Sequence, residues 1–285
     1  VVLEPNPKIK RRFQLDEIEE LRRKEEGSSA DVIEMHVKSH ADTLITVSEL
    51  AKLTALSPEE VEQDVKELEE QGSIYVFPMR KDTYVWHSDS AREAEHTLLK
   101  ALKEYEEKYP YRYGMKKAEV QTTYFKKIKP NVYDKILTLL EEKGSIKRID
   151  EFLCTTEYEV RKDKIYDKVS KIMLDTFGKA KFDFARYSEI TCKDVSQDIM
   201  DDILNILLEE KQIVKINDEM YTLTSYMETA KEKIREHLKD DPLITIAQVR
   251  DMFETSRKSA KPILEYMDSI KVTKKTGAES ERVAY

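Results

Sequence analysis

The stretch Leu68-Glu-Glu-Gln-Gly-Ser-Ile74 closes a helical pattern and opens a strand-like one. Related stretches recur as Leu140-Glu-Glu-Lys-Gly-Ser-Ile146, Leu208-Glu-Glu-Lys-Gln-Ile-Val214 and Leu264-Glu-Tyr-Met-Asp-Ser-Ile270. The intervals are 72, 68 and 56 residues, and self-similarity at such spacing indicates a tandem repeat. We therefore expect four copies of one small module.

The first copy indicates what a module contains. Ser57 is a favourable N-cap, Pro58 suits the first helical position and Gly72 ends the helix. An apolar stripe lies at helical spacing between them: Val61, Val65 and Leu68. β-branched and aromatic residues then form two strand-like runs, 74–77 and 83–86. A helix-turn-helix followed by a β-hairpin is typical of a winged helix.

A second marker recurs in the outer copies and predicts the start of the short helix. Thr46 is followed three residues later by Glu49, and Thr245 by Gln248. This spacing predicts a capping box at each position. Together the patterns predict a mainly α fold with short β-hairpins (α+β), built as four tandem winged-helix modules in an elongated array. We place the modules at residues 17–88, 89–158, 159–225 and 226–285.

Composition excludes several classes of protein. The 285 residues include 49 Lys and Arg against 57 Asp and Glu, a net charge of −8, with only 6 Gly and 8 Pro. No apolar run approaches the ~20 residues that span a bilayer, and no signal pattern opens the chain. Two cysteines, Cys154 and Cys192, cannot form a disulfide scaffold, so we expect a cytoplasmic protein. Because the chain opens with Val1, we expect a fragment or a processed chain.

Positive charge is concentrated near the end of the chain. Residues 255–275 hold six cations against two carboxylates, a net +4 that leaves −12 for the remainder. The cations are Arg257, Lys258, Lys261, Lys271, Lys274 and Lys275. They flank the expected reading helix and wing of the last module, the elements that contact nucleic acid in this fold. Arg282 on the return strand and Arg250 one helix earlier extend the predicted contact set.

A second basic segment lies in the second module. It contains Lys116, Lys117, Lys126, Lys127 and Lys129, interleaved with Arg112, Tyr109, Tyr111, Tyr113, Tyr124 and Phe125. Cations with aromatic residues support single-strand stacking. Aromatic residues at this spacing also form cores and interfaces, so the segment is either a secondary contact or a docking surface between modules.

No pattern indicates catalysis, and we expect no enzyme activity in this chain. The phosphate-binding pattern G-x-x-x-x-G-K-[ST] is absent from the sequence. His36 and His40 have a helical spacing, but no further ligands accompany them, so a zinc site is not expected. The two cysteines are expected to be small buried hydrophobic residues.

The last module carries a resemblance to a known family. The segment from Leu243 to Asp268 resembles the end of the bacterial selenocysteine-specific elongation factors (SelB), above all in Thr255-Ser-Arg-Lys258 and Leu264-Glu-Tyr-Met-Asp268. Val1-Val-Leu-Glu-Pro-Asn-Pro-Lys8 is similar to the segment that leaves the preceding β-barrel domain of that family. The resemblance implies that residues 1–16 are the end of that domain or a linker, followed by four winged helices.

The resemblance also implies a function. The chain would bind an mRNA hairpin near a UGA codon. It would thereby tether upstream domains that bind GTP and magnesium and carry selenocysteinyl-tRNA to the ribosome. No cofactor is implied for this chain, which is expected to be a monomer. By position, Ser256, Arg257 and Lys258 open the reading helix and Lys261 follows, while Lys271, Lys274, Lys275 and Arg282 belong to the wing.

Two features depart from a simple RNA-binding module. Pro262 lies inside the expected reading helix, which costs ~3 kcal/mol in a helix interior. A helix that begins near Ser259 would instead place this proline in its first turn. The wing loop Thr276-Gly-Ala-Glu-Ser-Glu281 is acidic, which disfavours RNA contact at the tip. A winged-helix scaffold for protein–protein interaction and a DNA-binding regulator remain alternative functions.

Overall fold

Four small antiparallel sheets confirm the tandem repeat and the mainly helical fold. The computed structural model describes residues 28–277 and 280–285, so the predicted segment 1–16 lies outside the described residues. Each sheet has three strands with the last strand in the middle, in the orders β1-β3-β2, β4-β6-β5, β7-β9-β8 and β10-β12-β11. Sequence analysis predicted only the hairpin of each module, and the structure adds a short strand before it.

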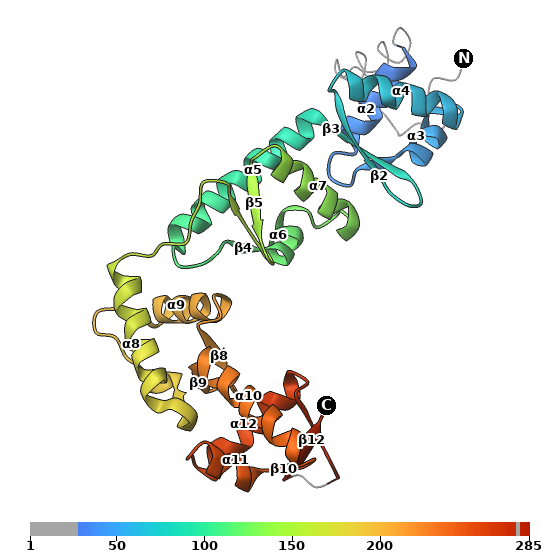
Figure 1. The fold of residues 1–285 in the computed structure, drawn as a ribbon. Helices are drawn as coiled ribbons and strands as arrows, with labels where there is room; N and C mark the ends of the chain where they lie inside the picture. The colour runs from blue at the N-terminus through green and yellow to red at the C-terminus, as the bar shows by residue number, and fades with distance from the viewer. Residues whose placement is uncertain (1–27, 278–279) are drawn as a thin grey trace. The chain divides into compact units, whose positions relative to one another are not determined.

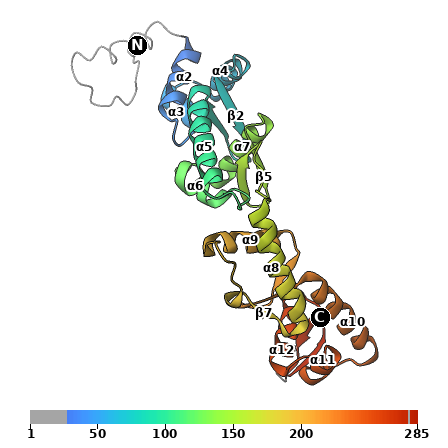
Figure 2. The same ribbon diagram turned by 90° about the vertical axis from the view of Figure 1, so that its left-hand side faces the viewer.

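The chain divides into two compact units, and the described part of the first comprises residues 28–109 and 113–158. Its first winged helix contains α2 (Ser29–Ser39), β1 (Ile45–Thr46), α3 (Val47–Thr54), α4 (Pro58–Glu70), β2 (Ile74–Pro78) and β3 (Thr83–His87). Its second contains α5 (Ser88–Lys108), β4 (Met115–Lys116), α6 (Lys117–Tyr124), α7 (Pro130–Glu142), β5 (Ile146–Ile149) and β6 (Phe152–Thr155). Figure 1 and Figure 2 show α5 leading from the strands of the first winged helix into the second.

The second unit comprises Pro110–Arg112 and Glu159–Tyr285. Its first winged helix contains α8 (Lys164–Ala180), η1 (Lys181–Asp183), β7 (Ala185–Arg186), η2 (Tyr187–Glu189), α9 (Gln197–Glu209), β8 (Ile213–Lys215) and β9 (Met220–Leu223). Its second contains α10 (Thr224–Asp240), β10 (Ile244–Thr245), α11 (Ile246–Met252), α12 (Arg257–Ser269), β11 (Thr273–Lys275) and β12 (Glu281–Ala284). The exact boundaries between the modules remain predictions.

Local sequence signals set the helix starts as expected. Thr46 caps α3 and Thr245 caps α11, and each makes the predicted capping box. Ser57 caps α4, with Pro58 at the first position of the helix. In each case the cap oxygen accepts a backbone N–H that the helix itself leaves without a partner.

The ends of the four second helices share one motif and correct the repeat alignment. After α4, the Ser73 N–H donates to the Leu68 carbonyl and Gly72 has a φ of +76°. The same pattern of bonds follows α7, α9 and α12, with Gly144, Lys211 and Lys271 in the left-handed conformation. This is the Schellman motif. The equivalents of Leu68 are therefore Leu140, Leu207 and Met267, so the third and fourth predicted copies were misaligned by one and three residues.

The third module departs from the predicted order of helices. Where the other modules have α3, α6 or α11, it has the 3₁₀ turn η2 and a loop up to Ser196. Arg186 precedes η2 and makes no side-chain cap bond. The following Ile190, Thr191 and Val195 are β-branched, which disfavours a helix. The prediction of a short helix here was wrong.

A hydrophobic cluster crosses the junction between the two winged helices of the first unit, and the first winged helix also has a cluster of its own. Leu44, Phe77 and Trp86 of the first belong to the same buried cluster as Leu98 and Leu102 of α5 and the interior of the second. Burial of apolar surface across the junction stabilises it at roughly 25 cal/mol per Å². The long helix α5 is therefore a packed element of this cluster.

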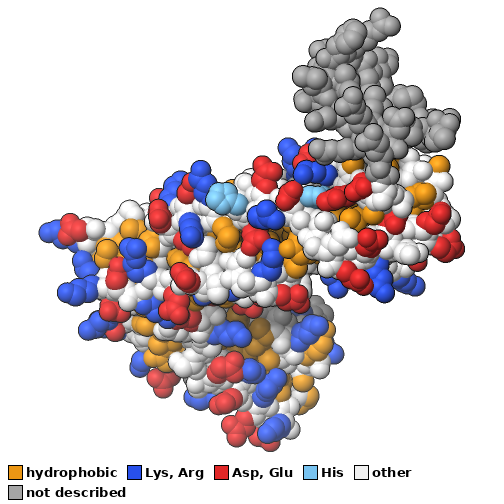
Figure 3. All heavy atoms as spheres, turned by 90° about the horizontal axis from the view of Figure 1, so that it is seen from above, with side chains coloured by type: hydrophobic (Ala, Val, Ile, Leu, Met, Phe, Trp, Pro, Cys, Tyr) orange, Lys and Arg blue, Asp and Glu red, His pale blue; other side chains and the backbone are white. Residues whose placement is uncertain are grey.

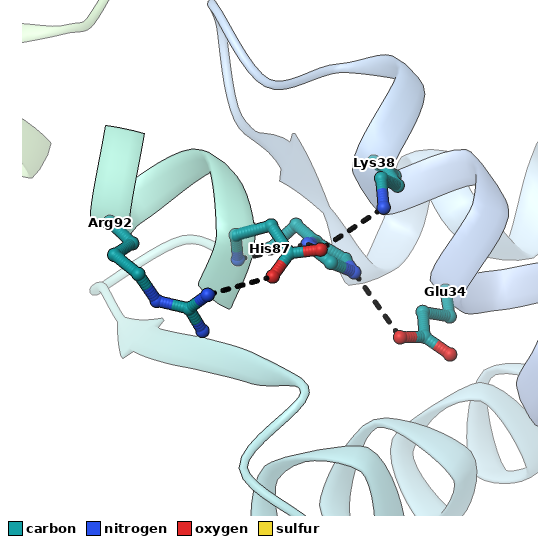
Figure 4. A network of polar contacts seen from close by, with 5 residues as sticks. Glu34, Lys38, His87 and Arg92 are labelled. Carbon is teal, nitrogen blue, oxygen red and sulfur yellow. Dashed lines mark hydrogen bonds and ion pairs between the residues drawn. The ribbon is translucent and has the colours of Figure 1, made fainter. Parts of the chain in front are cut away.

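A polar network fixes the start of α5 (Figure 4). The N–H of Asp89 donates to Nδ1 of His87 at 3.1 Å, so Nε2 carries the proton and donates to Glu34 at 3.2 Å. Lys38 and Arg92 pair with the Asp89 carboxylate at 3.1 and 3.5 Å. The hydrogen bond from Lys38 lowers the pKa of Asp89 below its usual value. Through these contacts His87 connects α2 to α5.

Candidate nucleic-acid interface

The helix α12 begins at Arg257, and the alternative start near Ser259 is wrong. Ser256 is the N-cap: its hydroxyl accepts the Ser259 N–H at 3.2 Å, and its carbonyl accepts the Ala260 N–H at 2.9 Å. Pro262 therefore lies in the second turn, where it has no N–H to offer the Lys258 carbonyl. The apolar stripe Ile263, Leu264 and Met267 is fully buried and outweighs this cost.

The first residues of α12 present exposed cations. Arg257 and Lys258 are exposed, and no residue in the described ranges forms an ion pair with either. Lys261 lies one turn later and is 3.8 Å from Glu265. We call Arg257, Lys258 and Lys261 the helix-start group. Arg250 on α11 is engaged by its neighbour Asp251, with an Nε–Oδ1 distance of 2.7 Å.

The predicted wing cations lie near the other end of α12. The helix is 13 residues long, so its ends are about 18 Å apart. Lys271 follows the last turn, and Lys274 and Lys275 lie on β11. All three are exposed, and none has a carboxylate partner within the described part of the chain. The structure therefore divides the predicted contact set into two separate groups.

Arg282 is a correction to the predicted set. It is 1% exposed, and its Nε donates to Asp268 at 2.7 Å. Thr273 donates to the second oxygen of the same carboxylate at 2.7 Å. Side chains alternate along β12, which turns Arg282 toward the core. Its role is to join α12 to the sheet, so we remove it from the surface that can meet a ligand.

The equivalent helices of the four winged helices differ sharply in charge. In their first seven residues, α4 carries four carboxylates and no cation, and α9 carries three carboxylates and no cation. In α7 one Asp and one Lys cancel, whereas α12 carries three cations and no carboxylate. Acidic and basic side chains are otherwise interspersed on the face in Figure 3. Only α12 has the charge that a polyanion requires at a reading helix.

Comparison with known proteins points in the same direction. Residues 236–280 and residues 99–153 each match a family model described as elongation factor SelB, winged helix. These two segments are winged helices of the SelB type. The selenocysteine-specific elongation factor of Desulfomicrobium baculatum is 23% identical over 239 residues, which cover 82% of this chain and 37% of that protein.

Two solved structures extend the comparison. The bacterial selenocysteine-specific elongation factor EF-Sec matches the whole chain with a TM-score of 0.51 and 15% identity, covering 42% of that protein. This likeness concerns the fold. The mRNA-binding domain of SelB from E. coli, solved in complex with SECIS RNA, is 23% identical over 32% of this chain and 73% of that one, with a TM-score of 0.29. The chain thus spans about two fifths of the length of its full-length relatives.

The third module supports the start of the SelB-type reading helix. The Phe182 and Phe253 rings pack with centroids 4.5 Å apart. The Thr255 hydroxyl lies within hydrogen-bond distance of the Phe182 carbonyl and the Asp183 carboxylate, which also accepts the Ser256 N–H at 3.4 Å. Sequence reasoning missed Phe182 and Asp183, because no local signal links residues 72 positions apart.

The second basic segment is mostly committed to internal contacts. Lys127 forms an ion pair with Asp42 at 2.7 Å, and Nζ of Lys129 donates a hydrogen bond to the Tyr84 hydroxyl at 2.7 Å. Lys117 pairs with Asp134, and Lys116 with Glu151 at 3.8 Å. Tyr111 and Phe125 are buried. The docking interpretation therefore holds for this segment, because Asp42 and Tyr84 belong to the first winged helix and Lys127 and Lys129 to the second.

The histidine pair and the two cysteines singled out in the sequence lie in positions that serve the fold. His40 contacts the His36 carbonyl through Nδ1 at 2.8 Å and caps α2. Among the residues that the structure describes, no three or more His, Cys, Asp or Glu side chains are placed to share a metal ion. Cys154 and Cys192 are buried, and burial raises the pKa of Cys154 to about 11. No helix in the described ranges has the length and apolarity that a membrane crossing requires.

Proposed function

We propose that this chain binds an mRNA hairpin through its last winged helix, as the mRNA-binding part of a selenocysteine-specific elongation factor. One observation carries the proposal. Of the two segments that match a SelB winged helix, residues 236–280 contain the reading helix that opens with Arg257 and Lys258, which are exposed and without ion-pair partners in the described structure. The equivalent helices of the other three modules lack this charge.

The chemistry of folded RNA favours this use of α12. The deep, narrow major groove of an A-form helix hides its base edges, so sequence is read in loops and bulges while phosphates are held nearby. The helix start offers two cations and the positive end of the helix dipole to such phosphates. The Ser256 hydroxyl is occupied by the Ser259 N–H, so we assign Ser256 to shaping the turn.

We assign the other activities of the family to the portion of its members that this chain does not cover. Over half of the length of each full-length relative lies outside the matched region. Binding of GTP, magnesium and selenocysteinyl-tRNA would belong there, and this chain would be a non-enzymatic, monomeric arm acting in the cytoplasm. Binding near a UGA codon raises the effective concentration of the attached domains at the ribosome.

The proposal is tested by measuring fluorescence anisotropy of a labelled hairpin with the full chain. The hairpin is taken from beside the UGA codon of a selenocysteine-encoding message, and a second hairpin carries the same stem with a scrambled loop. Charged hydrogen bonds contribute roughly 1.5–3 kcal/mol each, so Arg257→Gln with Lys258→Gln should weaken binding of the natural hairpin by about 100-fold.

The matched control is Lys100→Gln with Lys103→Gln, which removes the same charge from exposed positions on α5. This variant should bind within twofold of the native chain. Equal affinity for the scrambled loop would refute a specific RNA reader. Tighter binding to duplex DNA than to either hairpin would favour the DNA-binding alternative. No binding to any nucleic acid would favour the protein scaffold.

A further inference from the structure

The outer face of the wing holds an exposed aromatic side chain that the helix-start group does not use. Tyr285 is 65% exposed. Its N–H donates to the Val272 carbonyl at 3.2 Å, which continues the ladder between β11 and β12 by one residue. Lys274 lies opposite Val283 in this ladder, so alternation places Lys274, Val283 and Tyr285 on the same face. The ring therefore has a defined position on the sheet.

Two ammonium groups flank this ring. Nζ of Lys271 is 5.8 Å and Nζ of Lys274 is 5.9 Å from the ring centroid. Both distances suit a cation–π contact. Neither lysine forms an ion pair with any residue of the described chain. We call Lys271, Lys274 and Tyr285 the wing-base group. It combines a largely exposed aromatic face with two uncompensated positive charges.

The wing-base group is too far from the helix-start group to hold the same phosphates. The two groups lie beyond opposite ends of α12, which are about 18 Å apart. An exposed aromatic ring beside cations suits an unpaired nucleotide, whose base stacks on the ring while its phosphates meet the lysines. A base within a stem is already stacked on its neighbours, so this chemistry selects single-stranded RNA.

We propose that Tyr285, Lys271 and Lys274 bind an unpaired nucleotide that flanks the stem of the hairpin held by α12. This inference rests on the proposed function and adds a second contact to it. The helix-start group recognises the folded element, and the wing-base group holds the adjoining single strand without strong base preference. Stacking is tolerant of sequence because every base has a π face.

The test compares two RNAs on the full chain by fluorescence anisotropy. One is the blunt hairpin, and the other carries a flanking extension of four unpaired uridines, placed at the 5′ or the 3′ end in separate arms. We expect one extension to tighten binding by about tenfold, as one stacked base contributes. Tyr285→Phe should keep this gain because it keeps the ring. Tyr285→Leu and Lys271→Gln with Lys274→Gln should abolish it, and all variants should bind the blunt hairpin within about threefold of the native chain.

The control is again Lys100→Gln with Lys103→Gln, which should keep the full gain. The inference is overturned if neither extension tightens binding to the native chain, or if Tyr285→Leu retains the gain. Failure of the blunt hairpin to bind would overturn the proposed function instead. In that case, the inference is tested by measuring the binding of unpaired U₆ alone. Binding to the native chain that is lost in Tyr285→Leu would support the inference. Absence of binding to the native chain would overturn it.

Discussion

Two basic segments of this chain, residues 116–129 and residues 255–275, carry the same net charge, but they use their cations differently. In the second winged helix, Lys117 and Lys127 form ion pairs and Lys129 contacts Tyr84. In the fourth, Arg257 and Lys258 have no such partners among the described residues. Residues 116–129 and residues 255–275 each sum to +4. Net charge therefore identifies candidates, and pairing decides which of them can meet an anionic ligand.

The difference has a simple electrostatic basis. A lysine that faces a carboxylate is partly neutralised by it, so exchanging that partner for a phosphate gains less free energy than pairing a free cation does. A cation without a partner exchanges only water and counterions, and their release favours binding. The first segment therefore stabilises a junction between modules, whereas the second is available to a ligand.

The largest effect is expected on the stability of the last winged helix, from replacement of its buried cation Arg282. Arg282→Ala removes one member of a buried ion pair and leaves Asp268 without its partner. Such losses cost roughly 3–5 kcal/mol, and partial exposure of Asp268 places this one near 3 kcal/mol. Urea unfolding of residues 159–285, the continuous part of the second unit, measures the loss by circular dichroism. The double variant Arg282→Met with Asp268→Asn should recover part of the lost free energy of unfolding. If Arg282→Ala lost less than ~1 kcal/mol, the structural role of Arg282 would be wrong and the residue would again be a candidate for RNA contact.

The second prediction concerns how far the last winged helix depends on the third. Phe184 is buried in the core of the last module, and Phe182, Val214 and Ile216 pack against it. Residues 226–285 alone would expose this apolar surface, so we expect them to be about 2 kcal/mol less stable than the same module within residues 159–285. Thermal unfolding compares the two fragments. Equal midpoints would show that the module contains all of its own core.

The third prediction concerns the salt dependence of RNA affinity, which reports how many cations contact phosphates. For the hairpin with the favourable unpaired extension, five exposed cations predict a log–log slope of affinity against salt of about −3.5 to −4.5: Arg257, Lys258, Lys271, Lys274 and Lys275. Arg257→Gln with Lys258→Gln should reduce its magnitude by about 1.5. Lys116→Gln with Lys117→Gln should leave it unchanged, because these lysines face Glu151 and Asp134. A lowered slope in the second variant would show that the paired segment also meets the RNA.

The smallest effect is expected at the junction of the first two modules. Lys127→Ala with Lys129→Ala removes an exposed ion pair and a contact with the Tyr84 ring. Exposed pairs contribute about 0.2–1 kcal/mol, so we expect the first unit to lose roughly 1 kcal/mol. RNA affinity should stay within twofold of the native value. A tenfold loss of affinity would show that the basic segment of the second winged helix also contacts the RNA.

Part of the site could be read from the sequence because it depends on local chemistry. The N-cap at Ser57, the capping boxes at Thr46 and Thr245, and the helix stop at Gly72 each involve residues within a few positions. The charge of α12 and its place in the repeat are equally local. The alignment of the last two copies was wrong because Lys211 and Lys271 occupy the left-handed position where glycine is the usual signal.

The sequence by itself determined the repeated winged helix, its mainly helical character and the one basic reading helix, since periodicity and capping act over one or two helical turns. Only the tertiary structure decided that Arg282 is buried, that the lysines of the second module are paired, and that Phe182 and Asp183 hold the start of α12. Ion pairing and burial depend on which distant residues the fold brings within a few ångströms. The sequence therefore gives the number of charged side chains, whereas the tertiary structure decides which of them are exposed and unpaired.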